Sequence, residues 1–390
     1  MSRAGYALAL SGGGVRATVF HLGVLLRLAT EERLERVTQL STVSGGSLAA
    51  ALVFGANRHW PSSRQFIQKV LPHARMLLTE RSLQGSAALR TLARPWWLVR
   101  SRGNLFAEAL EKIWGVQGSL KQLAPTPLWL INSTCFETGR DWRFSQRHIG
   151  DWRFGHNYIQ EVPISIAIAA SAAIPYMAGF VTLTINPIGW HAIDPATDAP
   201  KAAIDPPSKS VRLWDGGVYE NLGLEALFKP QRGLVDNSVN LLIASDASAI
   251  LAEEYGPASG VFMARFPFLR PPRLFDIASE QVRALRSRML VDAAIRKELS
   301  AALLRLGRPA IYIDRAVERH RPEGAYAAYL SPADAKRAAS YPTDALKMRR
   351  DMFDLLLRHG FETADLTLTG YHPDQFQVQV AWQDAMRMAS

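Results

Sequence analysis

The sequence predicts an α/β fold with three layers, in which a mainly parallel central sheet is covered by helices on both faces. Two observations near the N-terminus carry this prediction. Residues 6–10 form a short apolar strand, which a glycine turn joins to a helical pattern over 18–29. Residues 37–43 and 45–53 repeat this order of strand, turn and helix. Strand–helix units this close together favour parallel strands buried beneath helices.

The composition describes one globular unit. Of the 390 residues, 48% are hydrophobic and 21% are charged, which excludes a disordered chain. No internal repeat or clear linker divides the sequence. We therefore expect a single domain over 1–390, with its motifs in about 6–250, an inserted helical cap or lid at about 60–121 and a C-terminal helical extension at about 277–390.

Charge and cysteine content narrow the partners and the compartment. The net charge of +10 suits phospholipid surfaces, phosphate-bearing substrates or nucleic acid, and it equally suits a basic surface without a specific partner. Nucleic acid is not expected, because the arginines are scattered and no nucleic-acid motif accompanies them. Cys135 is the only cysteine, which excludes an intramolecular disulfide and fits a reducing compartment, so we expect a cytoplasmic protein.

Three segments bear on membranes. The N-terminal apolar run is too short for a secretory signal. The longest apolar run, 162–181, is interrupted by Pro163 and Pro175, which favours a buried core helix over a membrane span. Residues 94–100 combine two tryptophans with two arginines. That composition suits contact with a membrane surface, or alternatively a lid whose tryptophans pack onto the body of the protein.

Turn residues and apolar patterns place the remaining elements. Hairpin strands are expected at 128–134 and 142–144, an alanine-rich helix at 164–173 and an exposed loop at 185–209. Further strands are expected at 211–214, 239–244 and 310–314. Two late helices are expected at 277–306 and 346–359, the second ending at Gly360.

Ser44 lies where the second strand turns into its helix, which is the outline of a nucleophile elbow. Such a turn holds its serine at strained backbone angles, and the residues around it must therefore be small. Gly46 follows at the spacing that the motif requires, whereas Thr42 stands where the motif has its first glycine. The alternative is an ordinary serine–glycine turn that begins a helix.

The first strand ends in a second candidate turn, formed by Gly12, Gly13 and Gly14. Backbone N–H groups at such a strand-to-helix turn can bind a ligand phosphate or the oxyanion of an acyl-transfer intermediate. The glycine spacing matches neither a dinucleotide fingerprint nor a Walker loop. Because parallel neighbours end at the same edge of a sheet, this turn and Ser44 are expected to lie together. The alternative is a tight turn without a ligand.

A serine nucleophile needs a base, and the sequence offers two kinds. Asp215 ends a strand and is followed by Gly216 and Gly217, and burial can raise the pKa of a carboxylate toward neutrality. It is alternatively the opening residue of a β-turn. Three histidines follow it: His320, His359 and His372. His359 is explained as a charge at a helix C-terminus and His320 lies in a charged loop, so neither has a strand-end context.

Taken together, these turns resemble the patatin-like phospholipase family. The glycine turn reads Gly-Gly-Gly-Val-Arg-Ala over 12–17, with Ala17 where the family has glycine. The elbow reads Thr-Val-Ser-Gly-Gly over 42–46, and Asp-Gly-Gly stands intact at 215–217. An Ala-Ser-x-x-x-Pro helix end at 170–175 and an Asn-Ser-Thr to Thr-Gly-Arg hairpin at 132–140 are also similar to the family.

The resemblance implies a patatin-like fold and calcium-independent hydrolysis of phospholipid or lysophospholipid acyl esters at a membrane surface, with no metal or cofactor. Asp215 would take the proton of Ser44, and backbone N–H groups of the glycine turn would hold the oxyanion. Arg16 would either neutralise a lipid phosphate or brace the turn. Two alternatives stay open: a serine–histidine–aspartate hydrolase, and a catalytically weak lipid-binding or regulatory protein that Thr42 and Ala17 would suit.

Overall fold

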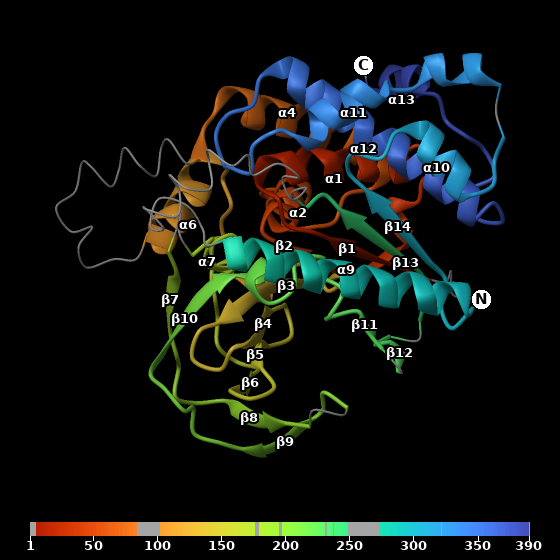
Figure 1. Ribbon diagram of the computed structural model, residues 1–390. Helices are drawn as coiled ribbons and strands as arrows, with labels where there is room; N and C mark the ends of the chain where they lie inside the picture. Colours follow the sequence, from red (N-terminus) through yellow and green to blue (C-terminus); the bar gives the residue numbers. More distant parts are fainter. Residues whose placement is uncertain are drawn as a thin grey trace.

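The computed structural model describes residues 5–83, 102–175, 179–194, 197–230, 232–236, 238–248, 273–320 and 322–389. The tryptophan–arginine segment at 94–100 lies outside them. Most of the strands belong to one 12-stranded mixed sheet (Figure 1). Its centre is parallel and runs in the order β14 (Ala301–Arg305), β13 (Val239–Asp246), β1 (Gly5–Leu10), β2 (Val37–Val43) and β3 (Leu128–Cys135).

Beyond β3 the sheet becomes antiparallel. The extension comprises β4 (Arg140–Phe144), β5 (Ile149–Asp151), β6 (Gly155–Asn157), β8 (Trp190–Ile193) and β9 (Pro200–Ala203). In addition, β10 (Ser210–Asp215) pairs with both β3 and β7 (Val181–Thr184). A separate pair is formed by β11 (Phe228–Lys229) and β12 (Gly233–Leu234). The predicted α/β fold with a parallel centre is therefore confirmed, and the antiparallel extension is an addition to it.

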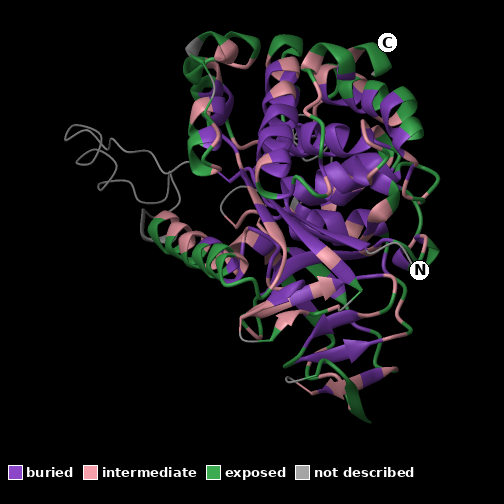
Figure 2. Ribbon diagram, turned by 90° about the vertical axis from the view of Figure 1, so that its right-hand side faces the viewer, coloured by how far each residue is buried: buried purple, intermediate pink, exposed green. Residues whose placement is uncertain are grey.

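The alternation of side chains along β1 explains the three layers. Tyr6, Leu8 and Leu10 point into a core shared with α1 (Gly14–Ala29), α2 (Gly45–Phe54) and α12 (Arg350–Tyr371). Ala7 and Ala9 point to the opposite face, where α9 (Arg273–Ile295) packs with Leu290 and Ala293. Because both faces of β1 are covered, its residues are apolar throughout. Figure 2 shows the resulting continuous buried centre.

Helix α1 is buried along its whole length and packs closely on α12. A Cβ atom on Gly23 would lie 2.1 Å from the Leu357 carbonyl oxygen, and one on Gly360 would lie 2.0 Å from that of Phe20. Gly360 thus allows two helices to approach each other, and α12 runs through it to Tyr371. The predicted helix end at Gly360 is wrong, and so is the placement of His359 at a helix C-terminus.

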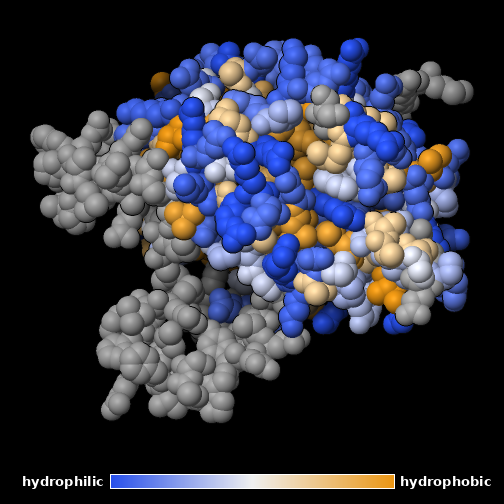
Figure 3. All heavy atoms as spheres, turned by 90° about the horizontal axis from the view of Figure 1, so that it is seen from above, coloured by the Kyte–Doolittle hydropathy of each residue, from blue (hydrophilic) through white to orange (hydrophobic). Residues whose placement is uncertain are grey.

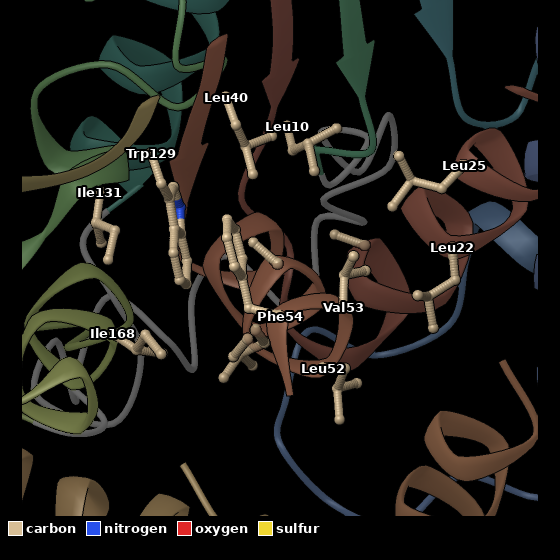
Figure 4. Packing of buried hydrophobic residues seen from close by; sticks show 14 of the residues in the cluster. Leu10, Leu22, Leu25, Leu40, Leu52, Val53, Phe54, Trp129, Ile131 and Ile168 are labelled. Atoms are coloured by element: carbon tan, nitrogen blue, oxygen red, sulfur yellow. The ribbon is translucent and has the colours of Figure 1, made fainter. Parts of the chain in front are cut away.

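Aromatic packing joins α2 to the sheet. The rings of Phe54 and Trp129 stack with centroids 4.8 Å apart and an interplanar angle of 5°. Figure 4 shows them between the helix and β3, with Leu40 and Ile131 beside them. This contact fixes the end of α2 opposite to Ser44. The helix that follows the elbow is therefore held at both ends.

Two further predictions need correction. Residues 310–314 belong to helix α10 (Ala310–Ala316) and not to a strand. The last strand is instead β14, which lies inside the stretch 277–306 expected to be one long helix. The predicted loop at 185–209 contains β8 and β9, and Trp190 on β8 is 1% exposed. An edge hairpin with short strands gives a weak periodic signal, which explains why it reads as a loop.

The other helices lie around this core. They are α3 (Ser63–Gln65), η2 (Phe66–Val70), α4 (Leu71–Glu80), α6 (Arg102–Ile113), α7 (Ile164–Ser171), α11 (Pro332–Ala339) and α13 (Trp382–Ala389), with the short η1 (Leu34–Arg36), η4 (Leu120–Gln122), η5 (Gly216–Val218) and η7 (Glu323–Ala328). Seen from above, the molecule is covered mainly by hydrophilic side chains (Figure 3). None of the helices in the described part of the chain is long and apolar enough to cross a membrane.

Candidate active site

Ser44 stands at the sharp turn between β2 and α2, with backbone angles of φ 49° and ψ −112°. Non-glycine residues rarely adopt a positive φ, and holding one there costs on the order of 1–3 kcal/mol, which the surrounding structure must supply. The strained serine that the elbow pattern predicts is therefore present. Ser44 is 5% exposed, so its hydroxyl lies in a largely water-excluded environment.

The glycines after Ser44 are needed because the start of α2 touches the end of β1 and the glycine turn. A Cβ atom on Gly46 would lie 2.2 Å from the Leu10 carbonyl oxygen, and one on Gly45 would lie 2.3 Å from that of Gly14. Both contacts are to backbone, which has little freedom to move aside. The elbow is thus packed directly against the strand that leads into the glycine turn.

We expect Gly46→Ala to destabilise the protein by about 1–3 kcal/mol, because the added methyl group must displace backbone. Urea unfolding followed by circular dichroism measures this change. Gly324→Ala is the matched control, since nothing lies within 4 Å of its Cβ position and its φ is not left-handed. Equal stability of the two variants would contradict the close contact between α2 and β1.

Thr42 does not crowd the elbow, because its side chain points into a buried chain of hydroxyl groups. Its Oγ1 accepts a hydrogen bond from Trp129 Nε1 (2.9 Å) and lies 2.8 Å from Ser47 Oγ. Ser47 Oγ lies 2.9 Å from Ser171 Oγ, which in turn accepts the backbone N–H of Ser44 (3.0 Å). This series of hydroxyl groups anchors the elbow to α7 and β3. Sequence reasoning missed it, although small polar residues in otherwise apolar helices were its signal.

The glycine turn contains two amides without a hydrogen-bond partner among the described residues. The Gly12 N–H binds the Asn221 carbonyl (3.0 Å) and the Val15 N–H binds the Asp344 carbonyl (2.9 Å). Between them, the amides of Gly13 and Gly14 make no hydrogen bond with any residue that the structure describes. Their φ angles of 140° and 61° lie in the region that favours glycine. Of the three predicted glycines, Gly12 therefore does not offer its amide.

The turn also lies directly beside the serine. A Cβ atom on Gly12 would be 3.2 Å from Ser44 Cβ and 2.2 Å from Asn221 Oδ1. A Cβ atom on Gly217 would be 2.6 Å from the same oxygen. Asn221, whose Nδ2 donates to Ser248 Oγ (2.9 Å), thus lies between the glycine turn and the Asp215 turn. Sequence reasoning gave Asn221 no role of its own.

Arg16 is buried and turned toward the C-terminal part of the chain. Its Nη1 donates to the carbonyls of Ala339 (3.1 Å) and Tyr341 (2.8 Å), and its Nη2 donates to that of Ala247 (3.4 Å). Burial lowers the pKa of Arg16 to about 10. These contacts correspond to the bracing role and not to contact with a lipid phosphate. Together with Asp344, they clamp the glycine turn from a region far beyond the motifs.

Ala17 fits the same packing. Its methyl group would lie 3.0 Å from a Cβ atom on Gly13 and 3.0 Å from one on Gly45. The side chain therefore fills the space between the glycine turn and the elbow, and neither neighbour has room for a side chain. A methyl group at this position is accommodated because both neighbours are glycine.

Strand pairing brings Asp215 to Ser44. Two strands pair with the same side of β3, one after the other. Strand β2 is parallel to it and ends with Val43 opposite Asn132. Strand β10 is antiparallel to it and ends with Asp215 opposite Ser133. The end of β10 therefore meets the end of β2. There the Ser44 hydroxyl lies close enough to the Asp215 carboxylate to lower its pKa, and Asp215 Oδ1 accepts the Gly217 N–H (2.7 Å).

Burial raises the pKa of Asp215 to about 6, against the opposing effects of the hydrogen bond from the Gly217 amide and of the nearby Ser44 hydroxyl. Gly216 allows the chain to turn at this point, because a Cβ atom there would lie 2.5 Å from the Asn132 carbonyl oxygen. A carboxylate with this pKa is ionised at neutral pH and has a higher proton affinity than an exposed aspartate. It has the chemistry of a general base.

The candidate histidines lie elsewhere. His320 Nδ1 is 3.1 Å from the Glu318 carbonyl, His359 Nε2 accepts the Gly307 N–H at 2.8 Å, and His372 Nε2 is 3.0 Å from the Ala301 carbonyl. No histidine in the described residues hydrogen-bonds Ser44 or Asp215. The same residues contain no group of three or more His, Cys, Asp or Glu side chains arranged to hold a metal ion.

Comparisons with known proteins identify the family of this chain and its fold. A family model described as patatin-like phospholipase matches residues 8–228. The structure of human GIVD cytosolic phospholipase A2 is similar at a TM-score of 0.55 and 17% identity, over 100% of this chain and 64% of that one. This chain thus spans less than two thirds of the human chain, and the likeness at this identity concerns the fold.

Other matches are more distant. A complex of the human enzyme with methyl gamma-linolenyl fluorophosphonate gives a TM-score of 0.47 and 16% identity, over 99% of this chain and 59% of that one. VipD from Legionella pneumophila gives 0.39 and 12%, over 94% of this chain and 67% of that one. A comparison with curated protein sequences finds no match.

Proposed function

This chain belongs to the patatin-like phospholipase family, whose model covers more than half of it, and from that premise we propose that it hydrolyses acyl esters of phospholipids or lysophospholipids. The observation that supports this most is the strained Ser44 next to a buried Asp215, beside two glycine amides that have no hydrogen-bond partner among the described residues. A strained serine, a base and oxyanion donors are the groups that acyl transfer requires.

In the proposed mechanism, Ser44 Oγ attacks the ester carbonyl carbon while Asp215 takes the hydroxyl proton. The amides of Gly13 and Gly14 stabilise the resulting oxyanion. Asp215 then returns the proton to the leaving alcohol oxygen, which completes the acyl-enzyme. A water molecule, deprotonated by Asp215, releases the fatty acid and restores Ser44. Arg16 acts in this scheme by holding the glycine turn in place, and Gly12 acts by leaving room beside Ser44.

The proposal is tested by incubating the protein with phosphatidylcholine vesicles and an alkyl fluorophosphonate in separate experiments. We expect lysophospholipid and free fatty acid by mass spectrometry, unchanged by EDTA, and one phosphonate adduct on the peptide that carries Ser44. A protein that binds the vesicles but neither releases acyl chains nor reacts with the phosphonate would support the lipid-binding alternative instead. The cytoplasmic location and the contact with a membrane surface stay predictions.

The pKa of Asp215 sets a pH dependence. The base must be ionised to accept the proton, so kcat/KM is expected to rise with pH through about 6 and to level off above pH 7. Below the midpoint the rate falls about tenfold per pH unit. Initial rates on a soluble p-nitrophenyl ester between pH 4.5 and 8.5 measure the profile. A profile without a rise near pH 6 would contradict Asp215 as the base.

A further inference from the structure

A second cavity lies at the β14 edge of the sheet. It has a volume of about 940 Å³, is open to solvent on one side, and is lined by the C-terminal half of α9, β14, α10 and α12. This volume is within the range of about 300–1,000 Å³ that is typical of ligand sites. None of the residues that line it belongs to the elbow, the glycine turn or the Asp215 turn.

The cavity is separate from Ser44. In the strand order β14–β13–β1–β2, the serine follows β2 while the cavity adjoins β14. Three strand spacings separate them, which is about 14 Å across the sheet. A molecule bound here would therefore not occupy the space beside Ser44.

Most of the cavity wall is apolar. The aliphatic side chains come from α9, β14, α10 and the segment between α9 and β14, and they include Leu290, Val291, Ala294, Leu299, Leu303 and Ile313. Among the described residues, β14 has a strand partner on one edge only, and its other edge opens toward the cavity. An acyl chain would bury the apolar wall without leaving polar groups of its own unpaired.

The same cavity carries unbalanced positive charge. Four cationic residues line it, and none of them forms an ion pair with a described residue: Arg288, Lys297, Arg305 and Arg308. Among the described residues that line the cavity, Asp292 is the only acidic one, and it forms an ion pair with Arg296 (2.9 Å). Charge complementarity therefore favours an anionic ligand.

Arg305 is the most informative of these residues. Its Nε is buried and has no hydrogen-bond acceptor among the residues that the structure describes, and burial lowers the pKa of its guanidinium. Asp246 lies opposite it on β13, but that carboxylate is held by Arg283 at 2.7 Å. A buried donor on a cation without a partner is costly, and a bound carboxylate would relieve that cost.

Two hydroxyl groups point to the same conclusion. Ser287 and Thr363 each line the cavity and are each 1% exposed. Within the described part of the chain, the side-chain oxygens of both have no hydrogen-bond partner. They come from α9 and α12, on opposite sides of β14. Buried hydroxyl groups normally find partners, so the wall has an unmet hydrogen-bonding group on each side of β14.

From these observations we propose that the cavity binds a long-chain fatty acid, with the carboxylate at Arg305 and the acyl chain along the apolar wall. The binding does not depend on the proposed hydrolysis, although that reaction would supply such a molecule. The site is therefore tested by binding and not by turnover.

The experiment measures the binding of oleate to the Ser44→Ala protein by equilibrium dialysis. We expect binding to weaken at least tenfold in Arg305→Gln, which removes the cation, and in Ala294→Trp, which fills the cavity. Arg337→Gln, an exposed arginine on α11 away from the cavity, is the matched control and should bind oleate normally. Thermal melting shows whether each variant is folded.

Two results would overturn the proposal. Oleate binding that neither Arg305→Gln nor Ala294→Trp changes would place the fatty acid elsewhere on the protein. Binding of acetate as tight as that of oleate would mean that the site takes a small anion and not an acyl chain. Weaker binding of oleyl alcohol than of oleate is expected, because the alcohol lacks the carboxylate.

Discussion

Ser44→Ala is expected to reduce acyl-ester hydrolysis to the background rate, a loss of about 10⁴-fold or more, because no other group would take the place of the nucleophile. The measurement is the release of fatty acid from phosphatidylcholine, followed by mass spectrometry. Ser210→Ala is the matched control, since Ser210 is exposed at the far end of the strand that carries Asp215. Full activity of Ser44→Ala would rule out Ser44 as the nucleophile.

A second variant at the same position separates the loss of the hydroxyl from the backbone strain. Glycine adopts φ 49° without the penalty that serine or alanine carries. Ser44→Gly is therefore expected to be as inactive as Ser44→Ala but more stable than it, by about 1 kcal/mol or more in urea unfolding. Equal stability of the two variants would mean that the elbow relaxes when the hydroxyl is removed.

The second large effect is expected for Asp215→Asn. The amide oxygen can still accept the Gly217 N–H, but the residue can no longer take a proton from Ser44. We expect kcat/KM to fall by about 10²–10⁴-fold, the usual contribution of a general base, and the rise in rate near pH 6 to disappear. The pH profile distinguishes a lost base from a merely misplaced serine. An unchanged rate would exclude the dyad.

The stability of the folded protein should respond to Asp215→Asn differently from its activity. The folded-state pKa of Asp215 is about 6, above its value of 3.8 in the unfolded chain, so the folded state binds the proton more tightly. The contribution of this group to stability is present below pH 3.8 and is lost as the pH rises through 6. At pH 7 the neutral asparagine avoids that loss. Asp215→Asn is therefore expected to be at least as stable as the natural protein, which thermal melting measures.

The local motifs were predictable because each depends on a few adjacent residues. A strand that breaks into Gly-Gly-Gly, a serine before Gly45 and Gly46, and Asp-Gly-Gly each specify a turn by their own backbone requirements. The parallel centre of the sheet follows from the spacing of the first two strand–helix units. The errors fall where long-range packing overrides a local signal. Gly360 reads as a helix end, yet it serves the contact between α1 and α12.

The sequence by itself therefore determined the fold class and the three turns that compose the candidate site, including the strain at Ser44. Only the tertiary structure decided how these turns are used. It placed Asp215 beside Ser44 through the antiparallel pairing of β10 with β3, assigned the Gly12 amide to Asn221, and turned Arg16 toward Ala339 and Tyr341. These contacts join residues separated by up to 325 positions, and a sequence read in local windows contains no signal for them.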